Sequence, residues 1–285
     1  MGDTFYIRPM QPADLDFAAA CAAAEGWPSE TRAVFEAFLE YDPQGCLAAQ
    51  AAGQPIGIGI ATCYGSEGFV GELIVVPEWR GRGVGQSLLS HALDYLQARG
   101  ARTVWLDGMV KAVALYERNG FRKVCRSLRF TGRLEGRAHG DIRPLQAADL
   151  PAVTELDRRA FHADRRFFIE RQAALNPDLC KVAERDGRIL GFVLGQRGQG
   201  VVTAGPWVAL PELKHPERLL ESLALAAQAE CLRIGVLETN PWAAWLVRSL
   251  GLSEVPDPPW RMALGDVTRL GISTMALAIG SPAKG

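Results

Sequence analysis

The chain has 285 residues, of which 48% are hydrophobic and 22% are charged, a composition typical of a globular protein with enough core material for two domains. Its net charge of −1 gives no indication of nucleic-acid or membrane binding, and no apolar run reaches the ~18 residues that a membrane-spanning helix needs. The amino terminus lacks a basic and then apolar leader, so we expect a cytoplasmic protein. Six scattered cysteines, without a C-x-x-C pair or a partnering histidine cluster, predict reduced thiols and no metal site.

Charge is distributed unevenly along the first half of the chain. Residues 1–78 carry two basic side chains against eleven acidic ones, whereas residues 79–135 carry eleven basic against four acidic. Two segments of opposite sign favour two ligands of opposite sign. Two solvated faces that differ in charge would give the same pattern.

Apolar periodicity, proline and glycine divide the first half into strands and helices. Proline and aspartate mark helix starts, and glycine marks helix ends. The expected strands are 5–8, 45–51, 55–63, 69–76 and 103–107, with closing strands within 121–134. The expected helices are 13–24, 29–41, 84–98 and 111–118. This order predicts a mixed α/β fold in which helices flank a mixed sheet.

The same pattern occurs twice in the chain. Three segments of the first half have collinear counterparts in the second half, at offsets of 135, 134 and 131 residues. They are IRPMQPADL (7–15) and IRPLQAADL (142–150), GELIVVPE (71–78) and GPWVALPE (205–212), and LYERNGF (115–121) and LVRSLGL (246–252). We therefore expect two copies of one fold, residues 1–135 and 141–285, joined by the polar linker Glu135–Gly140.

A loop rich in glycine and arginine, Arg80–Gly85, joins the strand 69–76 to the helix 84–98. The free N–H groups and the positive dipole end of a helix start form an anion site, which glycines make accessible and arginines make more positive. The loop therefore predicts pyrophosphate binding. A G-x-G-x-x-G motif fails because Gln86 stands at its last glycine position, and a Walker A motif lacks its Gly-Lys-Ser/Thr.

Two landmarks resemble a known family. VVPEWRGRGVGQSLL (75–89) is similar to the Arg/Gln-x-x-Gly-x-Gly/Ala signature of the GNAT acyltransferases, and ALYERNGF (114–121) is similar to the helix of that family that carries a tyrosine before a Gly-Phe strand start. Residues 4–134 carry the resemblance most strongly, and residues 141–265 resemble the degenerate second domain of tandem members. The resemblance implies two GNAT-like domains, each with a twisted mixed sheet flanked by helices, and acetyl-CoA as the cosubstrate.

The resemblance also implies which residues bind the cosubstrate. Its pyrophosphate would lie on the loop and the helix start, and its pantetheine arm would bond to backbone groups of the preceding strand, in a gap beside the neighbouring strand. The residues so implied are Ile74, Val75, Val76, Arg80, Gly81, Arg82, Gly83, Val84, Gly85 and Gln86.

Two side chains are the candidate catalytic residues. Glu72 is the one acid in the apolar stretch FVGELIVV, and a carboxylate buried without compensation is costly, so it should face a cleft or a partner. There it would take a proton from an ammonium acceptor, with its pKa raised by the apolar setting; the alternative is a sheet-edge glutamate paired with an arginine. By the resemblance, Tyr116 would protonate the leaving CoA thiolate; the alternative is a helix residue with its hydroxyl at the surface.

The second copy lacks these residues. The counterparts of Glu72, Gly83, Gly85 and Tyr116 are Pro206, Glu217, Leu219 and Val247. We therefore expect the second copy to keep the fold without the chemistry, as a structural or acceptor-shaping domain. Its tryptophans are expected in the core or, alternatively, along an acceptor pocket between the domains; they are Trp207, Trp242, Trp245 and Trp260.

We expect an N-acetyltransferase that moves acetyl from acetyl-CoA directly to a primary amine of a small acceptor in a ternary complex. Acids in the first helices would favour a cationic acceptor; they are Glu25, Glu30, Glu36, Glu40 and Asp42. One alternative is a non-catalytic acyl-CoA sensor that acts through a protein partner. Another is an acceptor site in the second copy with a different mechanism.

Overall fold

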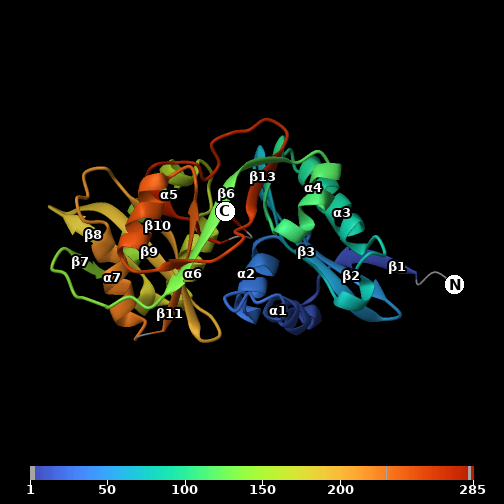
Figure 1. The fold of residues 1–285 in the computed structure, drawn as a ribbon, viewed down its shortest axis with the longest axis horizontal. Helices are drawn as coiled ribbons and strands as arrows, with labels where there is room; N and C mark the ends of the chain where they lie inside the picture. Colours follow the sequence, from blue (N-terminus) through green and yellow to red (C-terminus); the bar gives the residue numbers. More distant parts are fainter. Residues whose placement is uncertain (1–3, 229, 282–283) are drawn as a thin grey trace.

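The computed structural model describes residues 4–228, 230–281 and 284–285. Figure 1 shows two α/β lobes side by side, the first built mainly from the blue-to-teal half of the chain and the second mainly from the yellow-to-orange half. The red carboxyl-terminal segment runs back across the junction of the two lobes. The mixed α/β fold predicted from the sequence is confirmed, with two copies of the predicted module.

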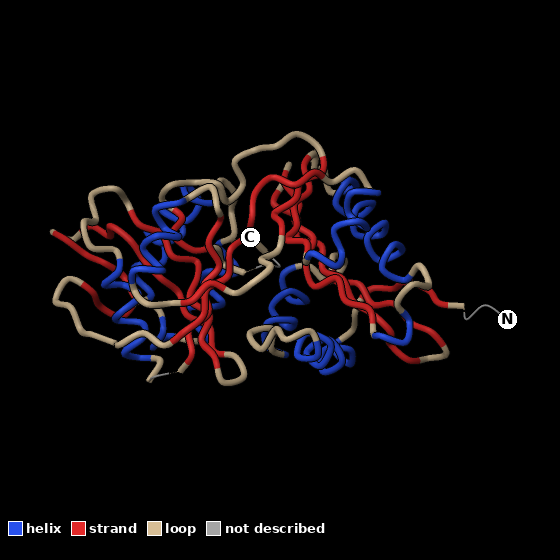
Figure 2. Tube along the Cα trace, in the orientation of Figure 1, coloured by secondary structure: helices blue, strands red, loops and turns tan. Residues whose placement is uncertain are grey.

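The first half of the chain follows the expected order of elements. Its strands are β1 (Phe5–Pro9), β2 (Cys46–Ala51), β3 (Gln54–Tyr64), β4 (Glu67–Val75), β5 (Thr103–Gly108) and β6 (Arg122–Gly132). Its α-helices are α1 (Leu15–Ala24), α2 (Arg32–Tyr41), α3 (Val84–Ala98) and α4 (Val113–Arg118). In Figures 1 and 2, α3 and α4 lie on one face of the sheet and α1 and α2 on the other.

The second half repeats this order and adds short strands. Its strands are β7 (Ile142–Pro144), β8 (Lys181–Arg185), β9 (Arg188–Arg197), β10 (Val201–Ala209), β11 (Cys231–Leu237), β12 (Ser253–Glu254), β13 (Trp260–Leu264) and β14 (Ala276–Ala278). Its α-helices are α5 (Leu150–Phe161), α6 (Arg166–Leu175), α7 (Glu217–Ala226) and α8 (Pro241–Ser249).

The repeated IRPxQxADL segment has the same structural role in both lobes. The Arg8 guanidinium donates to both carboxylate oxygens of Asp14, at 2.6 and 2.9 Å, and Arg143 donates to Asp149 at 2.6 and 2.8 Å. Each aspartate also accepts the backbone N–H three residues before it, at 2.8 Å. The repeat therefore fixes the turn between the first strand and the first helix in each copy.

The two lobes exchange strands. The second-half strand β13 lies between β5 and β6, antiparallel to both. The first part of β6 pairs with β13 and its later part, from Ser127, pairs with β11 of the second lobe, so the sheet continues from one lobe to the other. The predicted closing strands within 121–134 are therefore a single strand, β6. The position beside β5 is occupied by β13, which comes from the second half of the chain. The boundary at residues 135–141 stays a prediction.

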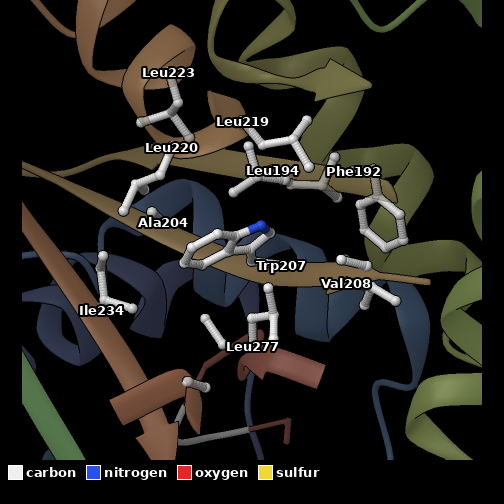
Figure 3. Packing of buried hydrophobic residues seen from close by; sticks show 14 of the residues in the cluster. Phe192, Leu194, Ala204, Trp207, Val208, Leu219, Leu220, Leu223, Ile234 and Leu277 are labelled. Atoms are coloured by element: carbon white, nitrogen blue, oxygen red, sulfur yellow. The ribbon is translucent and has the colours of Figure 1, made fainter. Parts of the chain in front are cut away.

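Both lobes have apolar cores, and one cluster joins them where Phe161 and Phe168 pack against the first half of the chain. In the second lobe the fully buried Trp207 packs among leucine, valine and phenylalanine side chains of both sheet and helices (Figure 3). In the first lobe the predicted apolar face of α3 is buried against the sheet at Val84, Leu88, Ala92 and Leu96. Burial of these side chains, each contributing roughly 1.5–3 kcal/mol for a residue the size of leucine, holds α3 and the loop before it on the sheet.

Candidate active site

The site begins where two neighbouring parallel strands separate. β4 pairs with β5 only from Glu67 to Val70, opposite Thr103 to Leu106. Beyond Val70, β4 continues to Val75 paired with β3 alone. The backbone groups on the β5 side of residues 71–75 are therefore left for other partners.

Glu72 lies at a bulge in this separating part of β4. The register with β3 shifts between Ile58 and Ile60, and Glu72 has a φ of 49°, in the left-handed region that a non-glycine residue rarely adopts. The side chain is buried, lines a cavity, and its Oε2 has no hydrogen-bond partner among the described residues. Burial raises the pKa of Glu72 well above its ordinary value; nearby Glu30 raises it further, and Lys284 acts in the opposite direction.

Tyr116 lines the same cavity. Its ring packs edge-on against Phe121, with centroids 5.9 Å apart, and closely over Gly108, where a Cβ would come within 2.9 Å of the ring. Burial alone raises the pKa of Tyr116 to about 12, so the phenol stays protonated at neutral pH. The hydroxyl forms no hydrogen bond within the described part of the chain, which leaves it available to a ligand. The surface alternative is wrong, because only 6% of Tyr116 is exposed.

The glycine loop opens the amino terminus of α3. Gly81 and Gly83 have φ values of 75° and 83°, and no atom lies within 4 Å of the position that a Cβ would take at either residue. The first bond of the helix runs from the Ser87 N–H to the Gly83 carbonyl, at 3.0 Å. The N–H groups of the three residues before Ser87 therefore have no helical acceptor and face outward at the positive end of a 15-residue helix.

The polar side chains of the loop are held by neighbouring groups. Arg80 donates from Nε to the Val75 carbonyl at 2.9 Å, and its Nη2 lies 2.5 Å from Glu25. Arg82 lies over the Trp79 ring, 5.2 Å from its centroid. The Gln86 amide is hydrogen-bonded to Asn119 at 2.7 and 2.9 Å, so its backbone N–H, and not its side chain, faces a ligand at the helix start.

The three residues expected to contact the pantetheine arm differ in their backbone bonding. The Val76 N–H donates to the Ile56 carbonyl and its carbonyl accepts from Trp79, both at 3.0 Å. Hydrogen-bonded and non-hydrogen-bonded residue pairs alternate along antiparallel strands. The backbone N–H and carbonyl of Val75 therefore point away from β3, toward the gap beside β5. The Val75 carbonyl already accepts from Arg80, so the Val75 N–H remains the predicted contact, whereas both backbone groups of Val76 are bonded within the protein.

A cavity of about 360 Å³ lies between the lobes and brings most of these groups together. Of the predicted site residues, its lining includes Glu72, Ile74, Val75, Arg80 and Tyr116. Val76 and the residues 81–86 lie outside the lining. The loop is nevertheless adjacent, since a Cβ on Gly85 would lie 3.7 Å from Val75.

The second lobe forms much of the cavity wall, which the sequence did not reveal. Its contributions include Thr203 of β10, Arg233 to Gly235 of β11, and the segment 279–281. Arg129 of β6 also lines the cavity on the part of that strand that has joined the second lobe. The only sequence signal was a polar residue interrupting an apolar strand, as Arg233 does in CLRIGVL.

The second lobe also holds the segment between α1 and α2. Ser29 Oγ lies 2.5 Å from Thr203 Oγ1, and the Ser29 carbonyl accepts from Gln196 at 2.8 Å. The Gly26 carbonyl accepts from Arg233 at 3.2 Å. These bonds place Glu30, the next residue after Ser29, in the cavity lining.

Glu30 is the acid of the first helices that the structure brings to Glu72. It is 7% exposed, and its Oε2 has no hydrogen-bond partner among the residues described. Burial raises the pKa of Glu30, and Lys284 opposes that rise. Because Glu30 also raises the proton affinity of Glu72, the two buried carboxyl groups favour a state with one proton between them.

A buried ion network forms part of the cavity wall. Asp107 accepts from Arg261 at 2.5 Å, from Ser127 at 2.7 Å and from Arg129 at 2.8 Å. Despite desolvation, the two arginines hold the pKa of Asp107 below its ordinary value. Arg261 is fully buried and belongs to β13, so the exchanged strand brings this cation to the first lobe.

The second copy of the site is closed. β10 pairs in parallel with β11 up to Ala204, and the register with β9 then shifts, as it does around Glu72 in the first copy. Here β14 pairs with Trp207 and Val208 and occupies the gap that stays open beside β4. The counterpart of the anion loop begins α7 with the carboxylate of Glu217 in its first turn.

The tryptophans of the second half do not line the cavity. Trp207 is in the core, as predicted, whereas Trp242 and Trp245 are 47% and 59% exposed on α8. Trp260 stacks under Arg126, 3.8 Å from the ring centroid. The expectation that some of them wall an acceptor pocket is wrong; the tryptophan in the cavity lining is Trp27.

Within 4–228, 230–281 and 284–285, no three histidine, cysteine, aspartate or glutamate side chains are grouped to hold a metal ion. No helix in this part of the chain has the length and apolar character required to cross a membrane.

Two family models match the chain, one in each half. The model described as "Acetyltransferase (GNAT) family" matches residues 13–121, and the model described as "Acetyltransferase (GNAT) domain" matches residues 153–273. A solved structure of a proposed acetyltransferase from Pyrococcus horikoshii has 25% sequence identity and a TM-score of 0.83, and the match covers 99% of this chain and 96% of that chain.

Curated relatives match parts of the chain. The ribosomal protein bS18-alanine N-acetyltransferase of Escherichia coli K12 is 33% identical over 76 residues, which are 26% of this chain and 51% of that protein. The mycothiol acetyltransferase of Thermobispora bispora is 37% identical over 93 residues, which are 29% of this chain and 32% of that protein. The chain thus spans about half or less of the length of the curated relatives it matches.

Proposed function

The chain is a member of the GNAT superfamily with two tandem domains, and we propose that its first domain transfers an acetyl group from acetyl-CoA to a primary amine of a small acceptor. The reacting amine arrives as an ammonium ion, and both substrates are bound at once. A cavity of about 360 Å³ between the lobes supports an acceptor of small-molecule size.

The observation that carries the proposal is the unpartnered Oε2 of Glu72 in the cavity wall. A raised pKa brings this carboxylate closer to the working pH of a general base than an exposed glutamate would be. The strained backbone at Glu72 is the kind of local cost that a functional position carries.

The residues present fit acetyl-CoA, which supplies an activated thioester. The N–H groups at the start of α3, with Gly81 and Gly83 leaving open space before them, would hold the pyrophosphate. The inward-facing N–H of Val75, in the gap where β4 leaves β5, would bond to the pantetheine arm. Ile74 lines the same stretch of the cavity.

Two proton transfers would then be carried out by side chains of the protein. Glu72, once deprotonated, takes a proton from the acceptor ammonium, directly or through one water, and so frees the amine lone pair. The amine would then bond to the thioester carbonyl carbon, and as the carbon–sulfur bond breaks Tyr116 would give its phenolic proton to the departing thiolate. The proton that the nitrogen loses as the amide forms would restore the phenol. A phenol with a pKa of about 12 would be a weak acid in bulk water. The same buried surroundings, however, also raise the pKa of a thiol beside it, so that the departing thiolate is a stronger base.

The second domain, which we place at residues 141–285, would shape the acceptor site without a transfer site of its own. Its gap is filled by β14, and Glu217 puts negative charge where a phosphate would bind.

The test is release of free thiol from acetyl-CoA in the presence of pooled primary amines. We expect release with at least one pool and a loss of roughly 100- to 10,000-fold in Glu72→Gln, whereas Glu78→Gln, at an exposed site after β4, keeps full activity. Tight acetyl-CoA binding without thiol release from any pool would instead favour an acyl-CoA sensor. Full activity in Glu72→Gln would favour a different mechanism.

A further inference from the structure

Most ionisable groups of the cavity wall are neutralised within the wall. Glu25 lies 2.5 Å from both Arg80 and Lys111. Asp107 is paired with Arg129 at 2.8 Å, and with the buried β13 arginine behind it. These groups set the shape of the cavity and leave little charge for a ligand to meet.

Four charged side chains of the lining lack such a partner, and three of them are buried or half-buried. Within the described ranges, Glu30, Glu72 and Arg233 form no ion pair, and a free Oε2 of each glutamate is buried. Lys284 is near enough to affect both glutamates but lies over phenylalanine rings, 5.3 and 5.5 Å from their centroids, without an ion pair. The remaining acid of the lining, Asp257, is exposed at the rim.

Arg233 is positioned to face a ligand from the second lobe. It lies on β11 opposite Thr203, on the same face of the sheet as Gly235 two residues on, and both of these residues also line the cavity. One of its N–H groups donates to the Gly26 carbonyl at 3.2 Å. A guanidinium has five N–H donors, so two parallel N–H groups of Arg233 remain available to bind both oxygens of a planar anion.

The unpaired groups are complementary to a molecule with one positive and one negative charge. Glu30 raises the proton affinity of Glu72, so one of the two keeps a proton and together they present about one negative charge. Lys284, whose own pKa is lowered by burial, opposes this effect without an ion pair to either carboxylate among the described residues. The single unpaired guanidinium matches a singly charged carboxylate better than a phosphate dianion, which the two glutamates would also repel.

We infer that the acceptor is an amino acid or an amino-acid derivative, whose ammonium group lies at Glu30 and Glu72 and whose carboxylate is bound by Arg233. The inference rests on the proposed acetyl transfer and names the substrate class of that same cavity. Arg233 is then a specificity-determining residue supplied by the domain that lacks transfer chemistry.

The test compares acceptors that differ only in the carboxylate. The matched pairs are L-lysine with 1,5-diaminopentane, L-arginine with agmatine and L-alanine with ethylamine, each assayed by thiol release from acetyl-CoA with the full chain. We expect kcat/KM to be at least about tenfold higher for the carboxylated member in one pair. The member without a carboxylate cannot form the paired, charge-assisted hydrogen bonds with Arg233. Arg233→Gln should reduce that preference roughly 10- to 100-fold through the KM of the carboxylated acceptor, and Arg233→Lys should restore part of it.

The controls separate recognition from structural support. Arg188→Gln removes an exposed arginine of the same lobe, outside the cavity, and should leave the preference unchanged. The inference is overturned if wild-type protein shows no preference in any pair, or if Arg233→Gln lowers kcat/KM equally for both members, since loss of the bond to Gly26 alone would do that. Absence of thiol release with every amine would overturn the proposed function itself.

Discussion

Replacement of Glu72 by glutamine should stabilise the folded protein at neutral pH while it removes the transfer activity. Glutamine keeps the size and shape of the side chain and removes a buried charge whose Oε2 has no hydrogen-bond partner among the described residues. Relief of that desolvation is worth about 1–3 kcal/mol. For a chain of this size, about 2 °C of apparent Tm per kcal/mol gives a rise of roughly 2–6 °C.

The sign of the pH dependence follows from the raised pKa. Because the folded state holds the Glu72 proton more tightly than the unfolded state, the wild type loses stability as pH rises from the unfolded pKa through the folded one. The glutamine variant does not titrate there, so the Tm difference should be near zero at pH 4.5 and should grow toward pH 8. In the glutamine variant the Glu30 carboxylate no longer lies near a second negative charge, which adds to the Tm difference from wild type.

Thermal unfolding monitored by fluorescence across this pH range measures the effect, with Glu78→Gln as the exposed control that should stay within about 0.5 kcal/mol of wild type. Over the same range, wild-type kcat/KM should fall as pH drops through the raised pKa of Glu72, because the base must be deprotonated. A Tm that falls in Glu72→Gln, or rises equally at all pH values, would refute the view that Glu72 is held as a costly, uncompensated carboxylate.

Three other substitutions test separate parts of the site. Tyr116→Phe keeps the packing against the sheet and should lower kcat roughly 100-fold with little change in KM, measured by thiol release. Gly83→Ala and Gly100→Ala both place a Cβ at a positive φ with open space around it, at about 1–2 kcal/mol each, yet only Gly83→Ala should weaken acetyl-CoA binding in calorimetry. Asp107→Asn leaves the fully buried Arg261 without its carboxylate and should cost about 3–5 kcal/mol, or roughly 6–10 °C of apparent Tm. Equal binding in the two glycine variants, unchanged kcat in Tyr116→Phe, or an unchanged Tm in Asp107→Asn would contradict the respective role.

Local signals predicted the first-lobe framework well. The helix 84–98 was predicted with the bounds it has, because an apolar stripe, a glycine loop before it and a glycine after it are all encoded within about 20 residues. The strand expected at 69–76 is β4, at Glu67–Val75. Glu72 was singled out by the cost of burying a charge in an apolar strand, and the structure buries it at 5% exposure.

Other features depend on contacts between residues far apart in sequence. The pattern WRMAL predicts a strand but not its neighbours, so the insertion of β13 between β5 and β6 could not be read from it. Glu30 looked like any acid of a solvated helix, because its burial comes from bonds that Ser29 makes to the second lobe. Arg233 was missed for the same reason: its face of the sheet meets the first lobe only after the strands have been exchanged.

The exchange explains why a copy without transfer residues retains the whole fold. Without β13, the first-lobe sheet would end at β5, whose far edge would lose its partner, and Asp107 would lose the buried cation of that strand. The first lobe in turn gives the later part of β6 to the second sheet. Because each lobe completes the other, selection that preserves the cavity between the lobes also preserves the framework of both copies. The positions free to change were those that contribute only to the gap beside β10 in the second copy. In that copy β14 fills the gap, and Glu217 lies in the first turn of α7.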